Sequence, residues 1–291
     1  MAQEKLAWQS KLVLLAVLPF AGTDVLLACY GWAARSAAVA IWTAGLSGLL
    51  GLVTWKLRAA TRAGAAAGAL IAASLMFSTV IFPYQPWHTA MVPTLAVSLL
   101  AFAATRVGRR QKERLGTAEA RRGRSASQVA ANLGMAALVA SGPVQLWLMD
   151  SGWYARATRT PRLGFVLALA ALAEAAADTV SSEIGQVLGS RPRMITTLRT
   201  VKPGRDGAVS MAGTLAGAVA AAIVAGAGSW ALRGDWNLFA LSCAGAIFGL
   251  FFDSLLGATL EEHGWLNNDA VNFLSTASAA GFALAIRAVL L

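Results

Sequence analysis

Charged residues are scarce in this chain of 291 residues, at 13%, whereas soluble domains carry roughly 25%. The 14 acidic residues are outnumbered by 24 Lys and Arg residues. Cysteine is limited to Cys29 and Cys243, both inside apolar runs, which excludes a disulfide framework and a thiolate metal site. The two histidines, His88 and His263, are far apart and form no metal-binding motif. These shortages exclude an ordinary soluble domain and the commonest structural metal sites.

Long apolar runs fill most of the chain, which is 57% hydrophobic with a mean hydropathy of +0.60. The runs are about 18 to 25 residues long, enough to cross a bilayer core of roughly 30 Å as helices. They are nearly continuous and rich in Ala and Leu, with no alternation of period two, which favours helices over a barrel. We therefore predict an all-α polytopic transmembrane bundle of about nine spans, with broken helices allowed around polar residues. The expected spans are 12–30, 39–55, 63–82, 89–105, 128–148, 163–188, 208–229, 237–256 and 269–290.

The positions of Lys and Arg predict the orientation of these spans, because cytoplasmic loops carry the excess of positive charge. With the N-terminus in the cytoplasm, 18 of these residues lie inside and 6 outside. We therefore expect a multi-pass protein of the inner membrane with its C-terminus outside. The basic segment 106–127 is the strongest anchor, as a cytoplasmic loop or a short amphipathic helix. Basic residues in short loops indicate membrane lipids as partners, not nucleic acid.

Acidic residues inside the sixth span are the first candidates for chemistry, because each costs about 2.5–3.5 kcal/mol on insertion scales. Glu174, Asp178 and Ser182 share one helical face at i, i+4 and i+8. Glu183 lies about 140° from Asp178 in an ideal helix. It joins the same site only if the helix bends or a second helix faces it. The plain alternative is a buried acid paired with an arginine of a neighbouring helix.

A basic, glycine-rich loop follows this span and has the physical features of a phosphate cradle. Its glycines allow a close approach of the backbone, and a helix beginning near Gly207 or Ala208 would direct free N–H groups at the loop. It lacks the Walker spacing, so no P-loop fold is implied. A capped basic turn with a Gly-x-x-x-Gly packing face remains the alternative. The candidate phosphate-binding residues are Arg199, Lys202, Gly204, Arg205, Gly207, Ser210, Gly213 and Thr214.

Further polar residues fall at the same predicted depth, although the topology rests on positive charge alone. Asp253 lies near the cytoplasmic end of the eighth span, and Asp178, Glu183 and Asp253 are the candidate catalytic residues and metal ligands. Carboxylates and amides beside a basic glycine loop favour a site for Mg²⁺ and phosphate. The residues with expected supporting roles are Gln128, Asn132, Ser182, Ser254, Asn268 and Asn272.

Taken in order, these motifs resemble the domain-of-unknown-function-92 family, also called transmembrane protein 19. The resemblance covers roughly residues 45–291 and rests on five blocks. They are Arg122 to Asn132, Asp178 to Gly185, Lys202 to Thr214, Asp253 to Ala258, and Asn267 to Asn272. The Glu261-Glu262-His263 turn and the alanines of 173–177 depart from the family pattern and bear on substrate choice.

The family includes the plant phytyl-phosphate kinase, so the resemblance implies a phosphotransferase in the membrane. The implied reaction converts an isoprenyl monophosphate, of phytyl or geranylgeranyl type, to its diphosphate. The implied requirements are Mg²⁺ and a nucleoside triphosphate, CTP or ATP. On this view residues 1–40 are an N-terminal segment with the first span, and 41–291 are one catalytic transmembrane domain with its active site facing the cytoplasm.

Two other function classes remain open from the residues. A transporter or flippase for an anionic lipid or metabolite would also place acids and broken helices at a basic site. A scaffold without a ligand is the third hypothesis. Nucleotide binding that depends on Mg²⁺ discriminates the enzyme from a simple carrier. The nucleotide, the lipid chain, the oligomeric state and the role of Asp24 are left open.

Overall fold

The computed structural model describes residues 6–117, 123–150, 163–189 and 191–290. Almost all of its elements are helices, which confirms the predicted all-α membrane class. The helices of the first half are Trp8–Arg35 (α1), Ala37–Lys56 (α2), Arg62–Ser78 (α3), Met91–Arg106 (α4), Arg109–Leu115 (α5), Ala126–Ala140 (α6) and Gly142–Asp150 (α7). Those of the second half are Leu163–Leu188 (α9), Met211–Ala231 (α10), Trp236–Leu256 (α11) and Asn268–Leu290 (α12), with a π-helix at Gly257–Glu261 (η1). Strands Arg193–Met194 (β1) and Ala208–Val209 (β2) pair antiparallel.

Each of the nine predicted spans contains a helix, but fewer helices are long enough to cross a bilayer without a break. Within the described ranges, six helices are long and apolar enough to cross a membrane, and the number rises to eight if each bent pair of helices is one span. The bent pairs are α4 with α5, at 66°, and α6 with α7, at 59°. Helix α3 has only 17 residues. The count of nine and the orientation therefore stay predictions.

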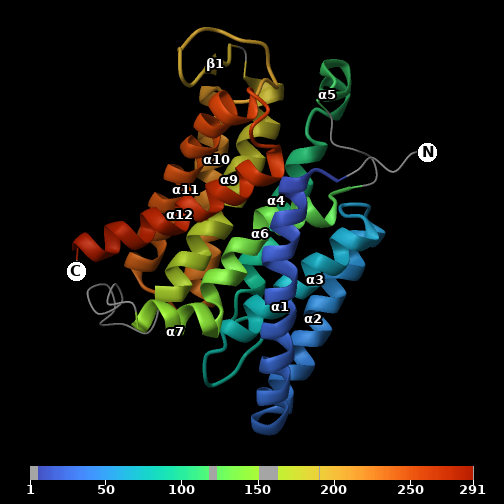
Figure 1. The fold of residues 1–291 in the computed structure, drawn as a ribbon, viewed down its shortest axis with the longest axis vertical. Coiled ribbons are helices and arrows are strands. Elements are labelled where there is room, and N and C mark those ends of the chain that lie inside the picture. Colours follow the sequence, from blue (N-terminus) through green and yellow to red (C-terminus); the bar gives the residue numbers. More distant parts are fainter. Residues whose placement is uncertain (1–5, 118–122, 151–162, 190, 291) are drawn as a thin grey trace.

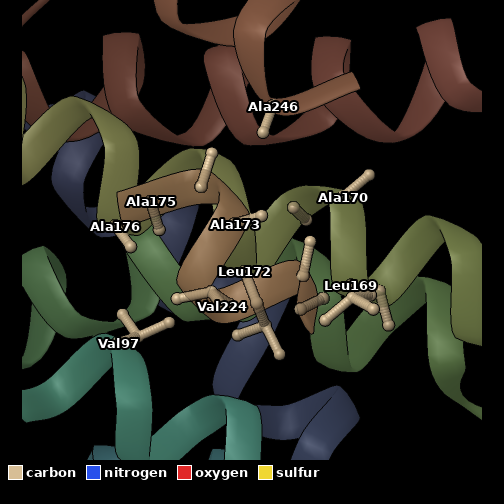
Figure 2. Packing of buried hydrophobic residues seen from close by; sticks show 14 of the residues in the cluster. Val97, Leu169, Ala170, Leu172, Ala173, Ala175, Ala176, Val224 and Ala246 are labelled. Carbon is tan, nitrogen blue, oxygen red and sulfur yellow. The ribbon is translucent and has the colours of Figure 1, made fainter. Parts of the chain in front are cut away.

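Helix α9 forms the centre of the bundle. It packs against α4, α6, α10, α11 and α12, and most of its apolar stretch is buried inside the molecule. Its middle is rich in alanine, and Figure 2 shows Ala170 and Ala173 in one buried cluster that also contains Val97 of α4, Val224 of α10 and Ala246 of α11. Small side chains let helices approach closely, which increases van der Waals contact within a membrane. The packing fixes the position of α9, and hence of the acids near its C-terminal end.

The polar segments gather at one end of the molecule. In Figure 1, α5 and the β1 segment lie at the same end of the long axis, and the junction of α1 with α2 lies at the opposite end. The predicted basic segment 106–127 contains the short helix α5. Arg122, which belongs to the family resemblance, and the rest of 118–122 lie outside the described residues.

Helix α1 is bound to the start of α12 by a buried polar cluster. Ser10 Oγ donates a hydrogen bond of 2.6 Å to Asp269 Oδ2 and accepts one of 2.8 Å from Asn267 Nδ2. Asn267 Oδ1 also accepts from the backbone N–H of Ala270 at 3.0 Å, as an N-cap does. This arrangement holds the first turn of α12, which carries Asn268 and Asn272, against the bundle.

Candidate functional site

A polar cavity of about 350 Å³ lies where α6, α9, α11, η1 and α12 meet the loop between β1 and β2. Thirteen of the seventeen predicted site residues line it, although they come from five separate stretches of the chain. They are Gln128, Asn132, Asp178, Ser182, Glu183, Gly204, Arg205, Gly207, Ser210, Asp253, Ser254, Asn268 and Asn272. The structure therefore brings these distant sequence blocks to one place.

Two carboxyl groups from different helices meet in this cavity. Asp178 of α9 and Asp253 of α11 lie within hydrogen-bonding reach of each other. Asp253 Oδ1 is buried and has no hydrogen-bond partner among the described residues. Two neighbouring carboxylates repel each other, and a buried polar oxygen without a partner is costly. A bound cation would remove both costs.

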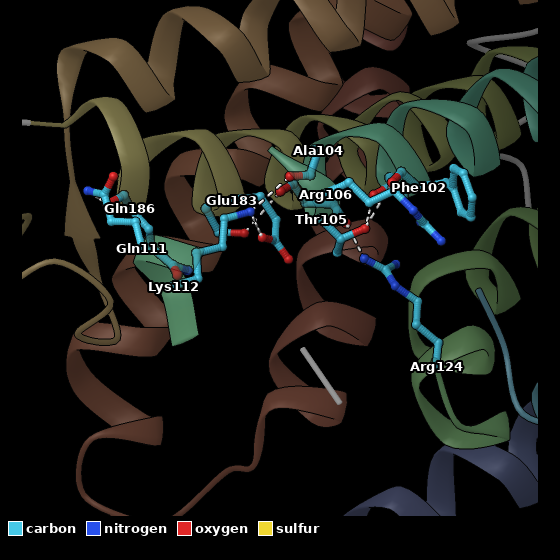
Figure 3. Close-up of polar contacts among 12 residues, drawn as sticks. Phe102, Ala104, Thr105, Arg106, Gln111, Lys112, Arg124, Glu183 and Gln186 are labelled. Atoms are coloured by element: carbon cyan, nitrogen blue, oxygen red, sulfur yellow. Dashed lines mark hydrogen bonds and ion pairs between the residues drawn. The ribbon is translucent and has the colours of Figure 1, made fainter. Parts of the chain in front are cut away.

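Glu183 lines the same cavity but is held by a buried ion pair. Its carboxylate pairs with Lys112 Nζ of α5, and Lys112 also donates to the carbonyl of Ala104 at 2.9 Å, as Figure 3 shows. The Lys112 side chain is 1% exposed and that of Glu183 is 14% exposed. Gln111 Nε2 adds a hydrogen bond of 3.3 Å to the carbonyl of Val187. These contacts fix α5 on the end of α9, and they occupy one oxygen of Glu183.

The carboxylates fit a divalent cation that shares its coordination with phosphate. Mg²⁺ is commonly held by one or two carboxylates together with substrate phosphates. In the part of the chain that the structure describes, no group of three or more His, Cys, Asp or Glu side chains is arranged to hold a metal ion. The predicted set of Asp178, Glu183 and Asp253 is thus not assembled as three protein ligands. The pair Asp178 and Asp253 fits Mg²⁺ if phosphate oxygens complete the coordination.

The loop of Gly204 and Gly207 lies directly on the π-helix η1. A Cβ added at Gly207 would be 2.4 Å from the backbone nitrogen of Ala258, and one added at Gly257 would be 2.8 Å from Gly207 N. Gly207 also has φ of +72°, in the left-handed region that favours glycine. Single-turn π-helices are frequent at functional sites. Glycine is therefore needed here for both backbone conformation and close approach.

Helix α10 begins at Met211, so the predicted start near Gly207 or Ala208 is wrong. Ala208 and Val209 instead form β2, which pairs with Arg193 and Met194. Ser210 is the N-cap, and its hydroxyl accepts a hydrogen bond of 3.1 Å from Gly213 N. The short strand pair extends the loop, and the free N–H groups at the helix start lie three or four residues later than predicted.

Four of the predicted phosphate-binding residues do not line the cavity. Arg199 and Lys202 are exposed on the loop beyond it. Gly213 packs against α9, where an added Cβ would be 2.6 Å from the carbonyl oxygen of Ser181. Thr214 follows on α10, its backbone N–H bonded to the Ser210 carbonyl at 2.8 Å. Gly213 thus acts in helix packing, the alternative that the Gly-x-x-x-Gly spacing left open.

The amide side chains contribute in two ways. Gln128 forms a capping box with Ser125, because its Oε1 accepts from Ser125 N at 2.8 Å. Asn132 Nδ2 donates to the Gln128 carbonyl at 2.9 Å, one turn further along α6. Asn268 and Asn272 line the wall formed by α12. The α6 amides are thus held by their own helix, which fixes their position at the cavity.

Several cavity residues were not among the predicted ones. Arg124 reaches α9 and donates from Nη2 to the Thr179 hydroxyl at 3.3 Å. Glu261 and Asp206 add two more acids to the wall. Burial and the neighbouring Glu262 raise the pKa of Asp206. In the sequence, Arg124 is one of many basic residues in 106–124, and Glu261 belongs to a turn typical of solvent exposure. Local sequence therefore did not mark either residue as part of the site.

Replacing Gly207 with alanine should disrupt the loop more than its backbone angle alone explains. Gly264 is the matched control, because its φ of +73° is almost the same and nothing lies within 4 Å of an added Cβ. Gly264→Ala should cost about 1–2 kcal/mol, the usual penalty for the left-handed conformation. Gly207→Ala should cost clearly more, since Ala258 is in the way. Thermal unfolding of both variants in one detergent measures the difference, and equal losses would contradict the close approach.

The family described as integral membrane protein DUF92 matches residues 45–280. An uncharacterized membrane protein of Synechocystis is 31% identical over 221 residues, which are 73% of this chain and 79% of that protein. An uncharacterized membrane protein of Methanocaldococcus jannaschii is 41% identical over 114 residues, 39% of this chain and 46% of its own length.

A plant protein is also similar. Protein VTE6, chloroplastic, of Arabidopsis thaliana is 31% identical over 183 residues, which are 62% of this chain and 53% of that protein. The chain thus spans about half the length of the Methanocaldococcus and Arabidopsis relatives. No solved structure matches the chain. The family match covers far more than half of the residues, and so the chain belongs to the DUF92 family of integral membrane proteins.

Proposed function

We propose that this protein is a membrane-embedded isoprenyl-phosphate kinase that depends on Mg²⁺ and a nucleoside triphosphate. The observation that carries the proposal is the meeting of Asp178 and Asp253 with the glycine loop of 203–210 in one cavity. The resemblance to a family that includes a plant phytyl-phosphate kinase supports the acceptor class and CTP as the donor. The basic segments at this end support a site that faces the cytoplasm at the inner membrane.

The charges on the cavity wall support a metal-bound nucleotide as the ligand. Five described acids line the wall, namely Asp178, Glu183, Asp206, Asp253 and Glu261, against two arginines. Arg205 is paired with Glu262, and Glu183 with Lys112. A free triphosphate would be repelled by this excess of negative charge. A triphosphate complexed with divalent cations would be attracted, because the cations would offset its negative charge next to the acidic wall.

In the proposed site, Asp178 and Asp253 would hold Mg²⁺, which would supply charge neutralisation on the transferring phosphoryl group. Gly204 and Gly207 let the backbone of the loop approach the phosphates. Arg124 offsets negative charge next to Asp178. Asn268 and Asn272 offer amide groups for hydrogen bonds to phosphate or ribose. Each residue binds or orients, and none acts as a base.

The proposed reaction balances without an acid or a base. An oxygen of the lipid monophosphate forms a bond to the γ-phosphorus of the nucleotide. The bond between that phosphorus and the β–γ bridging oxygen breaks, and its electron pair leaves with the nucleoside diphosphate. The attacking phosphate oxygen is already ionised near neutral pH, because the second pKa of a phosphate monoester is about 6. Positioning and electrostatic stabilisation therefore dominate, as in other phosphoryl transfers.

Purified protein in lipid nanodiscs tests the proposal directly. We expect labelled diphosphate from geranylgeranyl or phytyl monophosphate with γ-labelled CTP or ATP and Mg²⁺. Chelation with EDTA should abolish both turnover and nucleotide binding, and Mg²⁺ should restore them. Nucleotide binding of equal strength with and without divalent cations would contradict the proposal. So would the absence of diphosphate with every donor and acceptor pair, which would favour a carrier.

A further inference from the structure

A second cavity, of about 380 Å³, lies beside the candidate site between α2, α3, α4 and α6. Its size is within the range of about 300–1,000 Å³ typical of ligand pockets. The two cavities share Arg124 and Asn132 in their walls. The two cavities are therefore adjacent, and these two side chains belong to both walls.

Apolar side chains form much of the wall of the second cavity. Its walls include Leu50 of α2, Val97 and Ala101 of α4, and Val129 and Leu133 of α6. None of the described residues that line it is acidic. This interior suits a hydrocarbon chain, and it differs sharply from the acid-rich cavity next to it.

Arginines gather at the end of this cavity where α2 and α4 finish and α6 begins. Its wall contains Arg58, Arg106, Arg109 and Arg124. Arg106 lies over the ring of Phe102, 3.2 Å from its centroid, and donates to the Leu57 carbonyl at 3.4 Å. Arg109 also pairs with Glu113 at 3.2 Å. Guanidinium groups match phosphate oxygens in both charge and geometry.

The backbone holds two of these arginines on one wall. Arg124 N donates to the Ala59 carbonyl at 3.0 Å, and Thr61 N donates to the Arg124 carbonyl at 3.0 Å. This short ladder joins the loop of Arg58 to the segment of Arg124. Arg58 itself has φ of +55°, an uncommon conformation for a residue with a side chain. Such strained positions cluster at ligand sites.

We propose that this second cavity binds the acceptor, a single-chain lipid monophosphate, with its chain in the apolar interior and its phosphate among the arginines. The inference rests on the proposed kinase function and assigns the acceptor a place within it. Arg124 then lies between acceptor and donor, since its other contact is Thr179 in the nucleotide cavity. Charge complementarity and the shared wall both favour this occupant over a neutral lipid or a second nucleotide.

Gly68→Leu tests the apolar part of the site. Gly68 lines the cavity, and an added Cβ would meet only Val129 Cγ1, at 3.6 Å, so a larger side chain extends into the cavity without a backbone clash. Gly45→Leu on α2 is the matched control, because Gly45 is exposed and has nothing within 4 Å. Loss of space for one or a few carbons should raise the KM for geranylgeranyl monophosphate about tenfold or more. The KM for the nucleotide should stay unchanged in both variants.

A binding measurement separates this inference from the kinase proposal. A diazirine-bearing geranylgeranyl monophosphate, irradiated without nucleotide, should label peptides of α3, α4 and α6 in the full-length protein. Excess geranylgeranyl monophosphate should remove the label, whereas geranylgeraniol or inorganic phosphate should not. Labelling with this pattern supports the lipid site even if no turnover is found. Three results with active enzyme would overturn this inference while leaving the kinase proposal intact. The label could lie on other helices, geranylgeraniol or inorganic phosphate could remove it as well as the full lipid monophosphate does, or Gly68→Leu could leave the KM for the lipid unchanged.

Discussion

Asp253→Asn and Asp178→Asn should each lower turnover of isoprenyl monophosphate about 100- to 1,000-fold, the loss typical for removal of one preorganised electrostatic group. At the same time neither variant should unfold more easily. The two carboxyl groups meet in a half-buried cavity, and an amide removes one of two neighbouring charges. A variant that loses activity while keeping or gaining stability identifies a functional acid. Initial rates and thermal unfolding of the same preparations measure both effects.

The control for these variants lies on the same helix as Asp253. Asp235 caps the other end of α11, where its Oδ1 accepts from Leu238 N at 3.0 Å. Asn and Asp are almost equally good N-caps, so Asp235→Asn should change neither stability nor turnover. If Asp253→Asn behaved like Asp235→Asn, the proposed metal site would be wrong. Loss of stability together with activity would indicate a structural role instead.

Lys112→Met should be the most destabilising single substitution proposed for this protein. Lys112 is almost fully buried, and its removal leaves the Glu183 carboxylate without its cation. Breaking a buried ion pair by removing one partner typically costs about 3–5 kcal/mol. The double variant Lys112→Met with Glu183→Gln should recover a large part of this loss, because no unpaired charge remains. Arg114→Gln, on the exposed face of the same helix α5, should stay within about 0.5 kcal/mol of the unchanged protein.

The same variants distinguish two roles for Glu183. If Glu183 acts through Lys112, the double variant keeps Mg²⁺-dependent nucleotide binding. If Glu183 is itself a metal ligand, the double variant loses metal affinity even when its stability has recovered. The buried contact with Lys112 leads us to expect the first result, so Glu183 positions α5 and the end of α9. Nucleotide titrations at several Mg²⁺ concentrations measure the difference.

The helical class and the location of the polar end could be predicted from the sequence. Apolar runs of bilayer length define helices, and the i, i+4 spacing places Asp178 and Ser182 on one face. Both residues line the cavity, as does Asp253 from a helix about 70 positions further along the chain. Such agreement is expected where local pattern and tertiary packing act together, since an acid in a membrane is stable only beside other polar groups.

The rest depends on contacts between distant segments that no local pattern contains. The pairing of Glu183 with Lys112 requires the 66° bend between α4 and α5. The later start of α10 results from the pairing of β2 with β1, a ladder formed across the loop. Arg124 is placed at the cavity by its contacts with the 59–61 loop and Thr179. These features arise from tertiary contacts, so they could not be predicted from the sequence alone.

Pulsed electron–nuclear double resonance tests the central claim most directly, with Mn²⁺ in place of Mg²⁺ and a non-hydrolysable CTP analogue. Detergent-purified protein should show a ³¹P coupling to the bound Mn²⁺, and Asp178→Asn with Asp253→Asn should eliminate the bound ion and the coupling together. Mn²⁺ and nucleotide that bind with unchanged affinity and coupling after both substitutions would contradict the account, because the acids of α9 and α11 would then have no part in holding the metal and phosphate.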